Sequence, residues 1–375
     1  MAYERCGFSE LEMNTIEDIN MRVKFLKAHN GDSILLSFQD KENINRNILI
    51  DGGIKKTYKT DKGSKGKPEF GELKTIIDSI RAQERYIDLL IITHIDEDHI
   101  GGIVKWFNDD VNAFKLIKEV WFNSGEGIAT FLKQSENKDL EHPINPNKTT
   151  LTSINQGIDF SKYITEKGIL FTDIILQGNE LKRFGYDFKI LSPNKPKLEL
   201  LLKNWKLKEP NLNTVSKPND YAKTIKEHLV NDMFSEDNAY PNGSSIAFIL
   251  SKDEDNFLFL GDSHPSVIVE GLNKFNYSED NKITSKFVKL SHHGSKGNTN
   301  VELLKCINSN NFIISTNGSG DQHPHKQLLS RLIKENENCN IYFNYKDRME
   351  MIFSKQDRLD YTNFNPIAIT NEFEF

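Results

Sequence analysis

The sequence predicts an α/β fold, and three features support this prediction. From residue 70 onward, segments with apolar residues at helical spacing alternate with short apolar runs of strand length. Residue types that commonly bind metals follow several of these runs directly. Three consecutive runs, 256–260, 286–290 and 311–315, end in such residues, and open α/β sheets place their sites at the carboxyl ends of strands.

The N-terminal third is predicted to open with a meander of strands and then to alternate helices with strands. The predicted strands are 22–28, 33–38, 47–50, 88–93 and 116–122, and the predicted helices are 70–84 and 100–107. Residues 55–67 carry six lysines among Gly, Ser and Thr. We interpret this segment as a mobile, solvated loop, and the alternative is a basic flap that meets a phosphate backbone.

Residues 124–240 are less regular, and we interpret them as a family-variable insertion, mainly decoration, within a single domain that spans 1–375. Any protein partner is expected to bind through this insertion. Its predicted elements are helices near 150–165, 197–206 and 219–234 and a strand pair that ends at 188–194. Beyond it, the predicted strands are 244–251, 256–260, 286–290 and 311–315, and the predicted helices are 266–275, 299–307 and one that starts at Pro324.

The composition is that of a globular protein, with 37% hydrophobic and 27% charged residues and no run of about 18 apolar residues that would span a bilayer. Three widely spaced cysteines suit a reducing cytoplasm and offer no disulfide framework. The first residues lack the pattern of a secretory signal, so we expect a cytoplasmic protein without membrane association. The net charge of −6 gives no overall attraction for nucleic acid, but an acidic metal site would supply its own cations.

Residues 93–102 carry the strongest functional signal, because they place His94, Asp96, Asp98 and His99 directly after a buried strand and before two glycines. A single His-x-Asp is usually a surface turn. Imidazoles and carboxylates packed this densely in a dry place need a cationic partner, and a divalent metal is the simplest one. Six of the ten histidines also fall in three short stretches, which are His94/His99, His292/His293 and His323/His325. We therefore predict a metal site.

These motifs resemble those of the metallo-β-lactamase-fold hydrolases. Asp51 in Leu-Ile-Asp-Gly-Gly, the run from His94, Asp262 after Leu-Phe-Leu-Gly and His292 at a strand end match that family's motifs in order. A closer resemblance is to the hydrolase domain of ComEC-type DNA-uptake proteins and its free-standing relatives. It rests on Gly-Asp-Ser in the first hairpin, Asp96 in place of a histidine, His-His-Gly-Ser and a later His-Pro-His. The resemblance covers roughly 22–122 and 240–335.

The resemblance implies a four-layer αββα sandwich with the metal site at one edge of the sheets. It implies one complete metal position, formed by Asp98, His99 and His292 with Asp262 as a bridging carboxylate. A second position, formed by His94, Asp96 and the shared Asp262, is depleted because no histidine stands near 192–195, where the family's third metal motif falls. Because the second position has more oxygen ligands, Mn²⁺ is an alternative to Zn²⁺. One or two bound ions are expected. Asp51 is expected to orient the His94 loop rather than to bind metal.

Three residues receive catalytic roles in this interpretation. Asp98 is expected to bind metal and to accept a hydrogen bond from the nucleophilic water. His293 is expected to face away from His292, because neighbours on a strand point oppositely, which leaves substrate contact or a structural hydrogen bond. His323 is predicted to be the N-cap of a helix that begins at Pro324, at an anion-binding corner where a protonated imidazole donates to a leaving oxygen. His325 is left as a plain cap or a second contact.

We therefore expect a metal-dependent phosphodiesterase or nuclease that acts on nucleic acid or a nucleotide through a metal-bound hydroxide. Two alternatives stay open: hydrolysis of a small ester, lactone or thioester, and a regulatory or binding subunit with a degenerate metal site. The remaining histidines are expected to be surface or structural residues; they are His29, His142, His228 and His264.

Overall fold

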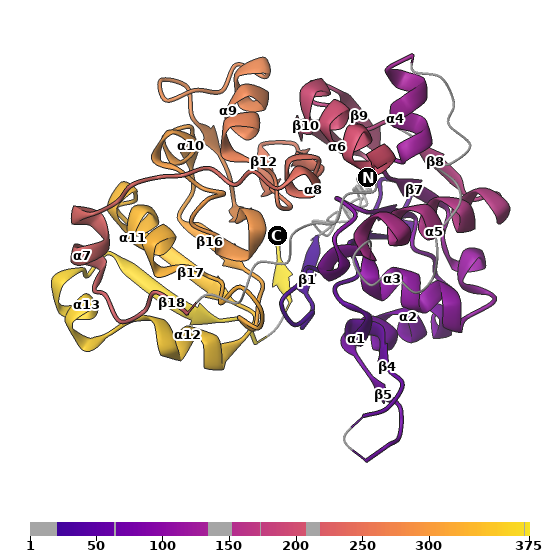
Figure 1. Ribbon diagram of the computed structural model, residues 1–375, viewed down its shortest axis with the longest axis horizontal. Helices are drawn as coiled ribbons and strands as arrows, with labels where there is room; N and C mark the ends of the chain where they lie inside the picture. The colour runs from indigo at the N-terminus through magenta and orange to yellow at the C-terminus, as the bar shows by residue number, and fades with distance from the viewer. Residues whose placement is uncertain (1–20, 64, 134–151, 173, 208–217, 371) are drawn as a thin grey trace, which may run out of the picture.

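The computed structural model describes residues 21–63, 65–133, 152–172, 174–207, 218–370 and 372–375. Two large mixed sheets form the centre of the molecule. In Figure 1 the indigo-to-magenta elements of the N-terminal half occupy one side of the molecule, and the orange-to-yellow elements of the C-terminal half occupy the other. No helix within the described ranges is both long enough and apolar enough to span a bilayer.

The first sheet has the strand order β19-β1-β2-β3-β6-β7-β8. Its β1–β2–β3 meander is antiparallel, and its strands from β3 to β8 run parallel. The strands are β1 (Arg22–Phe25), β2 (Ile34–Gln39), β3 (Asn45–Ile50), β6 (Leu89–Ile91), β7 (Glu119–Trp121), β8 (Leu170–Thr172) and β19 (Phe373–Glu374). The helices in this half are α1 (Lys55–Tyr58), α2 (Glu72–Ala82), α3 (Glu97–Asp109), η1 (Ala113–Leu116), α4 (Gly125–Phe131), α5 (Thr152–Glu166) and α6 (Lys195–Leu207).

The second sheet has the order β18-β17-β16-β14-β12-β11-β10-β9, antiparallel from β9 to β12 and parallel from β12 to β18. Its strands are β9 (Glu180–Arg183), β10 (Tyr186–Ser192), β11 (Ala247–Lys252), β12 (Asp255–Phe259), β14 (Phe287–Lys289), β16 (Asn311–Ile314), β17 (Cys339–Phe343) and β18 (Phe364–Ala368). The helices are α7 (Ile225–Val230), α8 (Tyr240–Gly243), α9 (Pro265–Lys274), η3 (Ser291–Gly294), α10 (Val301–Lys305), α11 (Lys326–Glu335), α12 (Lys346–Ile352) and α13 (Lys355–Asp360). Two short ladders complete the structure: β4 (Lys59–Thr60) with β5 (Glu69–Phe70), and β13 (Ile283–Thr284) with β15 (Ile307–Asn308).

The buried side chains form three layers of core, which establishes the αββα order. One cluster joins the inner faces of the two sheets and includes Leu36, Ile48, Phe248 and Phe287. A second cluster joins the outer face of the first sheet to α2, α3 and α5, and a third joins the outer face of the second sheet to α9 and α11. Alternate residues of a strand point to opposite faces, so both faces of each sheet are covered. The predicted αββα sandwich is confirmed.

Two expectations about loops need correction. Residues 55–67 do not form a plain solvated loop, because they contain α1 and β4, with Thr57 and Tyr58 buried. Residues 170–192 are not decoration, because β8 extends the first sheet and β9 and β10 extend the second. That residues 124–240 vary within the family, or bind a partner protein, stays a prediction.

Candidate metal centre

The strand ends bring the predicted site residues together at one edge of the sandwich. β6 ends at Ile91, and the following turn and first turn of α3 carry His94, Asp96, Asp98 and His99. In the second sheet, β12 and β14 are parallel neighbours that pair Phe259 with Lys289. This register places the segment with Asp262 beside the segment with His292 and His293, because both follow the carboxyl ends of these strands.

Asp262 lies at the centre of the site. It is 2% exposed, and the Nε2 atoms of four histidines lie around its carboxylate. The distances to the nearer carboxylate oxygen are 3.9 Å for His94, 3.3 Å for His99, 3.7 Å for His292 and 3.8 Å for His293. Ligand atoms about 2.1 Å from a tetrahedral ion are about 3.4 Å apart, so these separations suit atoms that share an ion.

The other nitrogen of each of these rings is held by the protein. A second bond of this kind fixes the tautomer and the orientation of a metal-binding imidazole. The Nδ1 partners are Asp51 Oδ2 for His99 at 2.8 Å, Thr93 Oγ1 for His94 at 3.1 Å, Asn298 Oδ1 for His292 at 3.0 Å and the carbonyl oxygen of Ser315 for His293 at 3.0 Å. All four rings therefore direct Nε2 at the central carboxylate.

The unsatisfied atoms of the site fit a divalent cation. The Nε2 atoms of His94, His99 and His293 and one oxygen each of Asp96 and Asp262 are buried without a hydrogen-bond partner among the described residues. Leaving such atoms unpaired costs about 1–3 kcal/mol each. The ligand atoms of Asp32, His99, Asp262 and His293 also lie within 4.8 Å of one another. Nitrogen and carboxylate donors at this density are the donors that Zn²⁺ and Mn²⁺ accept.

Two further carboxylates lie on different sides of this centre. Asp98 Oδ2 is 3.5 Å from His293 Nε2, and Asp96 Oδ2 is 3.8 Å from His94 Nε2. Both are partly open, with 25% and 20% of their side chains exposed. Asn30 Nδ2 donates to Asp98 Oδ2 at 3.3 Å. One donor group therefore lies around Asp98 and His293, and another lies around Asp96 and His94, with Asp262 between them.

The pKa shifts follow from burial and from these contacts. Burial would raise the pKa of Asp262, but His99, His292 and His293 hold it well below its usual value. Burial would lower the pKa values of His292 and His293, but the facing carboxylates raise them to about 10 and about 9. Burial and the neighbouring His99 lower the pKa of His94 to about 3. Burial, with Asp98 nearby, raises the pKa of Asp96 to about 7.

The expectation that His293 faces away from His292 is wrong. The rule of alternating faces applies to a strand, but both histidines lie in the η3 turn with left-handed backbone angles, φ 46° and 54°. This turn directs both rings at Asp262. Asp51 has the expected supporting position, because it accepts hydrogen bonds from the backbone and hydroxyl of Thr93 and contacts His99.

Asp32 is a site residue to which no role was assigned from the sequence. It is 2% exposed, its Oδ2 accepts a hydrogen bond from Lys289 Nζ at 2.5 Å, and its Oδ1 lies 3.4 Å from His293 Nδ1. Lys289 is itself 1% exposed in the middle of the second sheet. A lysine inside the apolar run Phe-Val-Lys-Leu was the signal that could have pointed to a buried carboxylate partner.

The predicted role of His323 as an N-cap is wrong. The N-cap is His325, α11 begins at Lys326, and the N–H groups of Lys326 and Gln327 donate to the carboxylate of Asp220. The carboxylate of Asp220 therefore occupies the helix start at which an external anion was expected to bind. The ring of His323 lies 4.8 Å from that of His292. Burial and the neighbouring His292 hold the pKa of His323 well below its usual value, so the imidazole is neutral near pH 7 rather than protonated.

The remaining histidines differ in their surroundings. His264 is not a surface residue, because it is 1% exposed and its Nδ1 accepts from Lys197 Nζ at 2.8 Å. His228 is also buried, and its Nε2 contacts the carbonyl oxygen of Asp220. His29 is partly buried beside the site, and burial together with Lys56 lowers its pKa. His142 lies outside the described residues.

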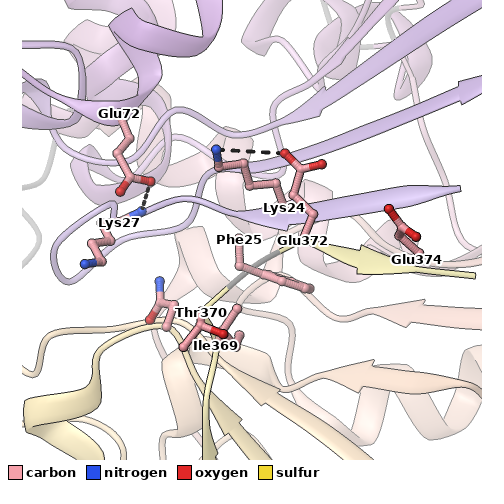
Figure 2. Close-up of a pocket in the computed structure, with 9 residues that line it drawn as sticks. Lys24, Phe25, Lys27, Glu72, Ile369, Thr370, Glu372 and Glu374 are labelled. Atoms are coloured by element: carbon pink, nitrogen blue, oxygen red, sulfur yellow. Dashed lines mark hydrogen bonds and ion pairs between the residues drawn. The ribbon is translucent and has the colours of Figure 1, made fainter.

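A cavity of about 750 Å³ lies where β1 meets the C-terminal strands, apart from the candidate ligands. Its walls carry charges of both signs, and Figure 2 shows Lys24 directed at Glu372 and the backbone N–H of Lys27 directed at Glu72. None of the candidate metal ligands lines it. Its mixed charge selects no particular class of ligand.

The sandwich and its carboxylate-centred histidine cluster define a metallo-β-lactamase-fold protein with a candidate metal site. Residues 32–158 match the family described as the metallo-beta-lactamase superfamily. A relative, ComE operon protein 3 of Bacillus subtilis (strain 168), is 22% identical over 356 residues, which cover 92% of this chain and 36% of the relative. The chain therefore spans about a third of the length of that relative.

The chain also has weak structural similarity to solved proteins. CmlA, a diiron beta-hydroxylase from Streptomyces venezuelae, is 10% identical with a TM-score of 0.39, and the match covers 95% of this chain and 54% of that one. A long form RNase Z from yeast is 11% identical with a TM-score of 0.38, and the match covers 95% of this chain and 48% of that one.

Proposed function

We propose that this protein is a metal-dependent phosphodiesterase that acts on nucleic acid or a nucleotide. The observation that carries the proposal is the arrangement of donors around Asp262. Four imidazole Nε2 atoms lie within 3.9 Å of its carboxylate, and Asp96 and Asp98 stand on different sides of it. A carboxylate shared between two donor groups supports a pair of divalent ions, an arrangement common in enzymes that cleave phosphate esters.

One ion would be held by two imidazole nitrogens, from His99 and His293, and by two carboxylates, from Asp98 and Asp262. The other donor group would hold an ion through His94, Asp96 and Asp262, and His292, whose Nε2 lies 3.7 Å from Asp262 Oδ2, would be a further ligand. Divalent ions in these positions would supply Lewis-acid polarisation of a phosphate oxygen and make bound water more acidic. The carboxylates of both groups suit Mn²⁺, and the imidazoles accept Zn²⁺ as well.

The side chains of the chain itself position the reactants. Asp98 is partly exposed and receives a hydrogen bond from Asn30, so its carboxylate is held in a direction from which it can accept a proton from water. His323 is neutral and adjoins His292, which suits a hydrogen bond to a substrate oxygen. The largely buried surroundings strengthen each of these contacts.

The motif resemblance to ComEC-type DNA-uptake proteins supports a nucleic-acid substrate, and the partly open carboxylates leave room for a charged phosphodiester. Two expected positive supports for phosphate are lost: Asp220 occupies the start of α11, and the lowered pKa of His323 removes the charge expected there, which leaves only a neutral hydrogen-bonding ring. Hydrolysis of a small ester or lactone stays the alternative reaction for the same donors.

The test is metal analysis followed by paired assays. The purified chain is expected to bind one or two Zn²⁺ or Mn²⁺ ions and to hydrolyse bis-p-nitrophenyl phosphate, with little activity on lactones. The isosteric Asp262→Asn variant, as control, should lose this hydrolysis. A chain that binds no divalent ion and cleaves no phosphodiester would contradict the proposal and favour a binding subunit. Activity on lactones alone would favour the alternative reaction.

A further inference from the structure

The β4–β5 hairpin carries lysines that the proposed chemistry does not use. Figure 1 shows this hairpin projecting beyond the body of the molecule. Its strands pair Lys59 with Phe70 and Thr60 with Glu69. The turn is closed by hydrogen bonds from the N–H of Gly63 to the carbonyl of Lys67 at 2.8 Å and from the N–H of Gly66 to the carbonyl of Gly63 at 2.9 Å. The projection is therefore a defined element with its own hydrogen bonds.

The base of the hairpin is anchored to the helix that carries two candidate ligands. Asp98 and His99 lie in the first turn of α3, and Asp109 is its last residue. Lys59 Nζ contacts Asp109 Oδ2 at 2.8 Å, and Lys105 Nζ contacts Asp61 Oδ2 at 2.8 Å. Ten residues of helix separate His99 from Asp109, which corresponds to about 15 Å at the usual rise per residue. The hairpin is thus held at a fixed distance from the metal centre.

The lysines of the hairpin differ in whether an acidic side chain offsets their charge. The charges of Lys59 and Lys105 are offset by Asp61 and Asp109. Lys62, Lys65 and Lys67 are exposed, and none of them forms an ion pair with a described residue. Glu69 on the same hairpin offsets part of this charge, but the three lysines still outnumber it in a chain with a net charge of −6. They form a local cationic surface that favours a polyanion.

An aromatic ring accompanies these charges. The side chain of Phe70 is at the base of the hairpin and is 62% exposed, with the ammonium of Lys74 5.5 Å from its ring centroid. An exposed ring beside lysines is the combination on which single-stranded nucleic acids stack their bases while their phosphates meet the cations. A lipid surface would not require a ring at the base of a hairpin whose lysines stand at its tip.

We propose that the β4–β5 hairpin binds a single-stranded nucleic acid whose scissile phosphate lies at the metal centre. This inference rests on the proposed phosphodiesterase function and deepens it, because it makes a polymer the preferred substrate. The span of about 15 Å corresponds to about four nucleotides at 3.4 Å each. Lys62, Lys65 and Lys67 contact phosphates beyond that span, and Phe70 stacks on a base.

The experiment compares a triple variant, Lys62→Ala with Lys65→Ala and Lys67→Ala, with a control that loses the same charge elsewhere. The control is Lys334→Ala with Lys346→Ala and Lys355→Ala, three exposed lysines of α11, α12 and α13. Binding of a labelled single strand of about 20 nucleotides, longer than the site sizes of typical binding domains, is measured by anisotropy in EDTA. Hydrolysis of the same strand and of bis-p-nitrophenyl phosphate is measured with Mn²⁺.

The hairpin variant is expected to bind the strand about tenfold more weakly, with a salt slope reduced by about 2, because each phosphate contact on a single strand contributes about 0.7. Its hydrolysis of bis-p-nitrophenyl phosphate should stay within twofold of that of the unmodified chain. Equal binding by both triple variants overturns the inference, as does loss of binding only to vesicles of anionic lipid. Hairpin-dependent binding without cleavage of any substrate would keep the hairpin as the binding site for the strand, but it would contradict the proposed function and the placement of a scissile phosphate at the metal centre.

Discussion

The Nε2 atom of His99 lies 3.3 Å from Oδ1 of Asp262, and this contact joins the two sheets at the site. His99 belongs to the helix that follows β6 of the first sheet, and Asp262 follows β12 of the second. Both side chains are buried. The carboxylate attracts imidazoles from both halves of the sandwich, so the charge of Asp262 organises the site as well as offering ligand atoms.

Replacing Asp262 should therefore remove metal and activity together. In Asp262→Ala, the four Nε2 atoms lose the one negative group that they share. The raised pKa of His292 loses its main cause, and that of His293 loses a contribution second to that of Asp32. We expect the bound metal, measured by elemental analysis after dialysis, to fall below a tenth of its original amount. The exposed Asp280→Ala, as matched control, should keep its full metal content. Retention of metal by Asp262→Ala would contradict the central role of this carboxylate.

His323→Ala should separate metal binding from turnover. The ring of His323 lies beside that of His292 but is absent from the group of ligand atoms around Asp262. We expect unchanged metal content and a fall in kcat for bis-p-nitrophenyl phosphate of about tenfold, the low end for loss of a positioned hydrogen-bonding group. His292→Ala provides the contrast, because it should lose metal. Equal loss of metal in both variants would show that His323 supports the ligands rather than the substrate.

The sequence was sufficient for the fold and for most of the residues that the structure brings together, but it assigned no role to Asp32. Apolar periodicity located the strands, and the ordered motifs identified His94, Asp96, Asp98, His99, Asp262 and His292. The predicted positions of the other site residues depended on local backbone conformation, which the sequence pattern did not reveal. His293 was misplaced because two consecutive left-handed residues cannot be inferred from a strand-like pattern. His323 was misplaced because its role depended on the start of α11, where Asp220, more than 100 residues away in sequence, accepts the free N–H groups.

Metal binding should release protons, and the affinity should rise with pH. In the metal-free chain the pKa values of His292 and His293 are raised to about 10 and about 9, so both rings are protonated at pH 7 and cannot bind an ion through Nε2. Each ring must lose its proton, so affinity increases from pH 7 upward and levels off as the pH passes these values. Calorimetry in buffers of different ionisation enthalpy measures the release, expected to be about two protons at pH 7. An affinity independent of pH between 7 and 9 would contradict the assignment of these two rings as ligands.

Gly31→Ala should weaken metal binding without touching a ligand. A Cβ atom at position 31 would lie 1.8 Å from the backbone carbonyl oxygen of Asp98, so the loop with Asp32 and the start of α3 must separate. This backbone contact also holds the N–H of Asp32, which donates to the same carbonyl at 3.1 Å. We expect a loss of stability of about 1–3 kcal/mol, as for other overpacked sites, and metal affinity at least tenfold lower.

The matched control for this change is Gly320→Ala. Gly320 has a positive φ of 81°, and a Cβ there meets no atom within 4 Å, so the substitution tests backbone strain alone. It should cost about 1 kcal/mol and leave metal affinity unchanged. Because Asp98 keeps its side chain in Gly31→Ala, weaker metal binding in that variant would come from displacement of the carboxylate. Equal metal affinity in the two variants would mean that the close approach of Gly31 to Asp98 supports only the stability of the fold.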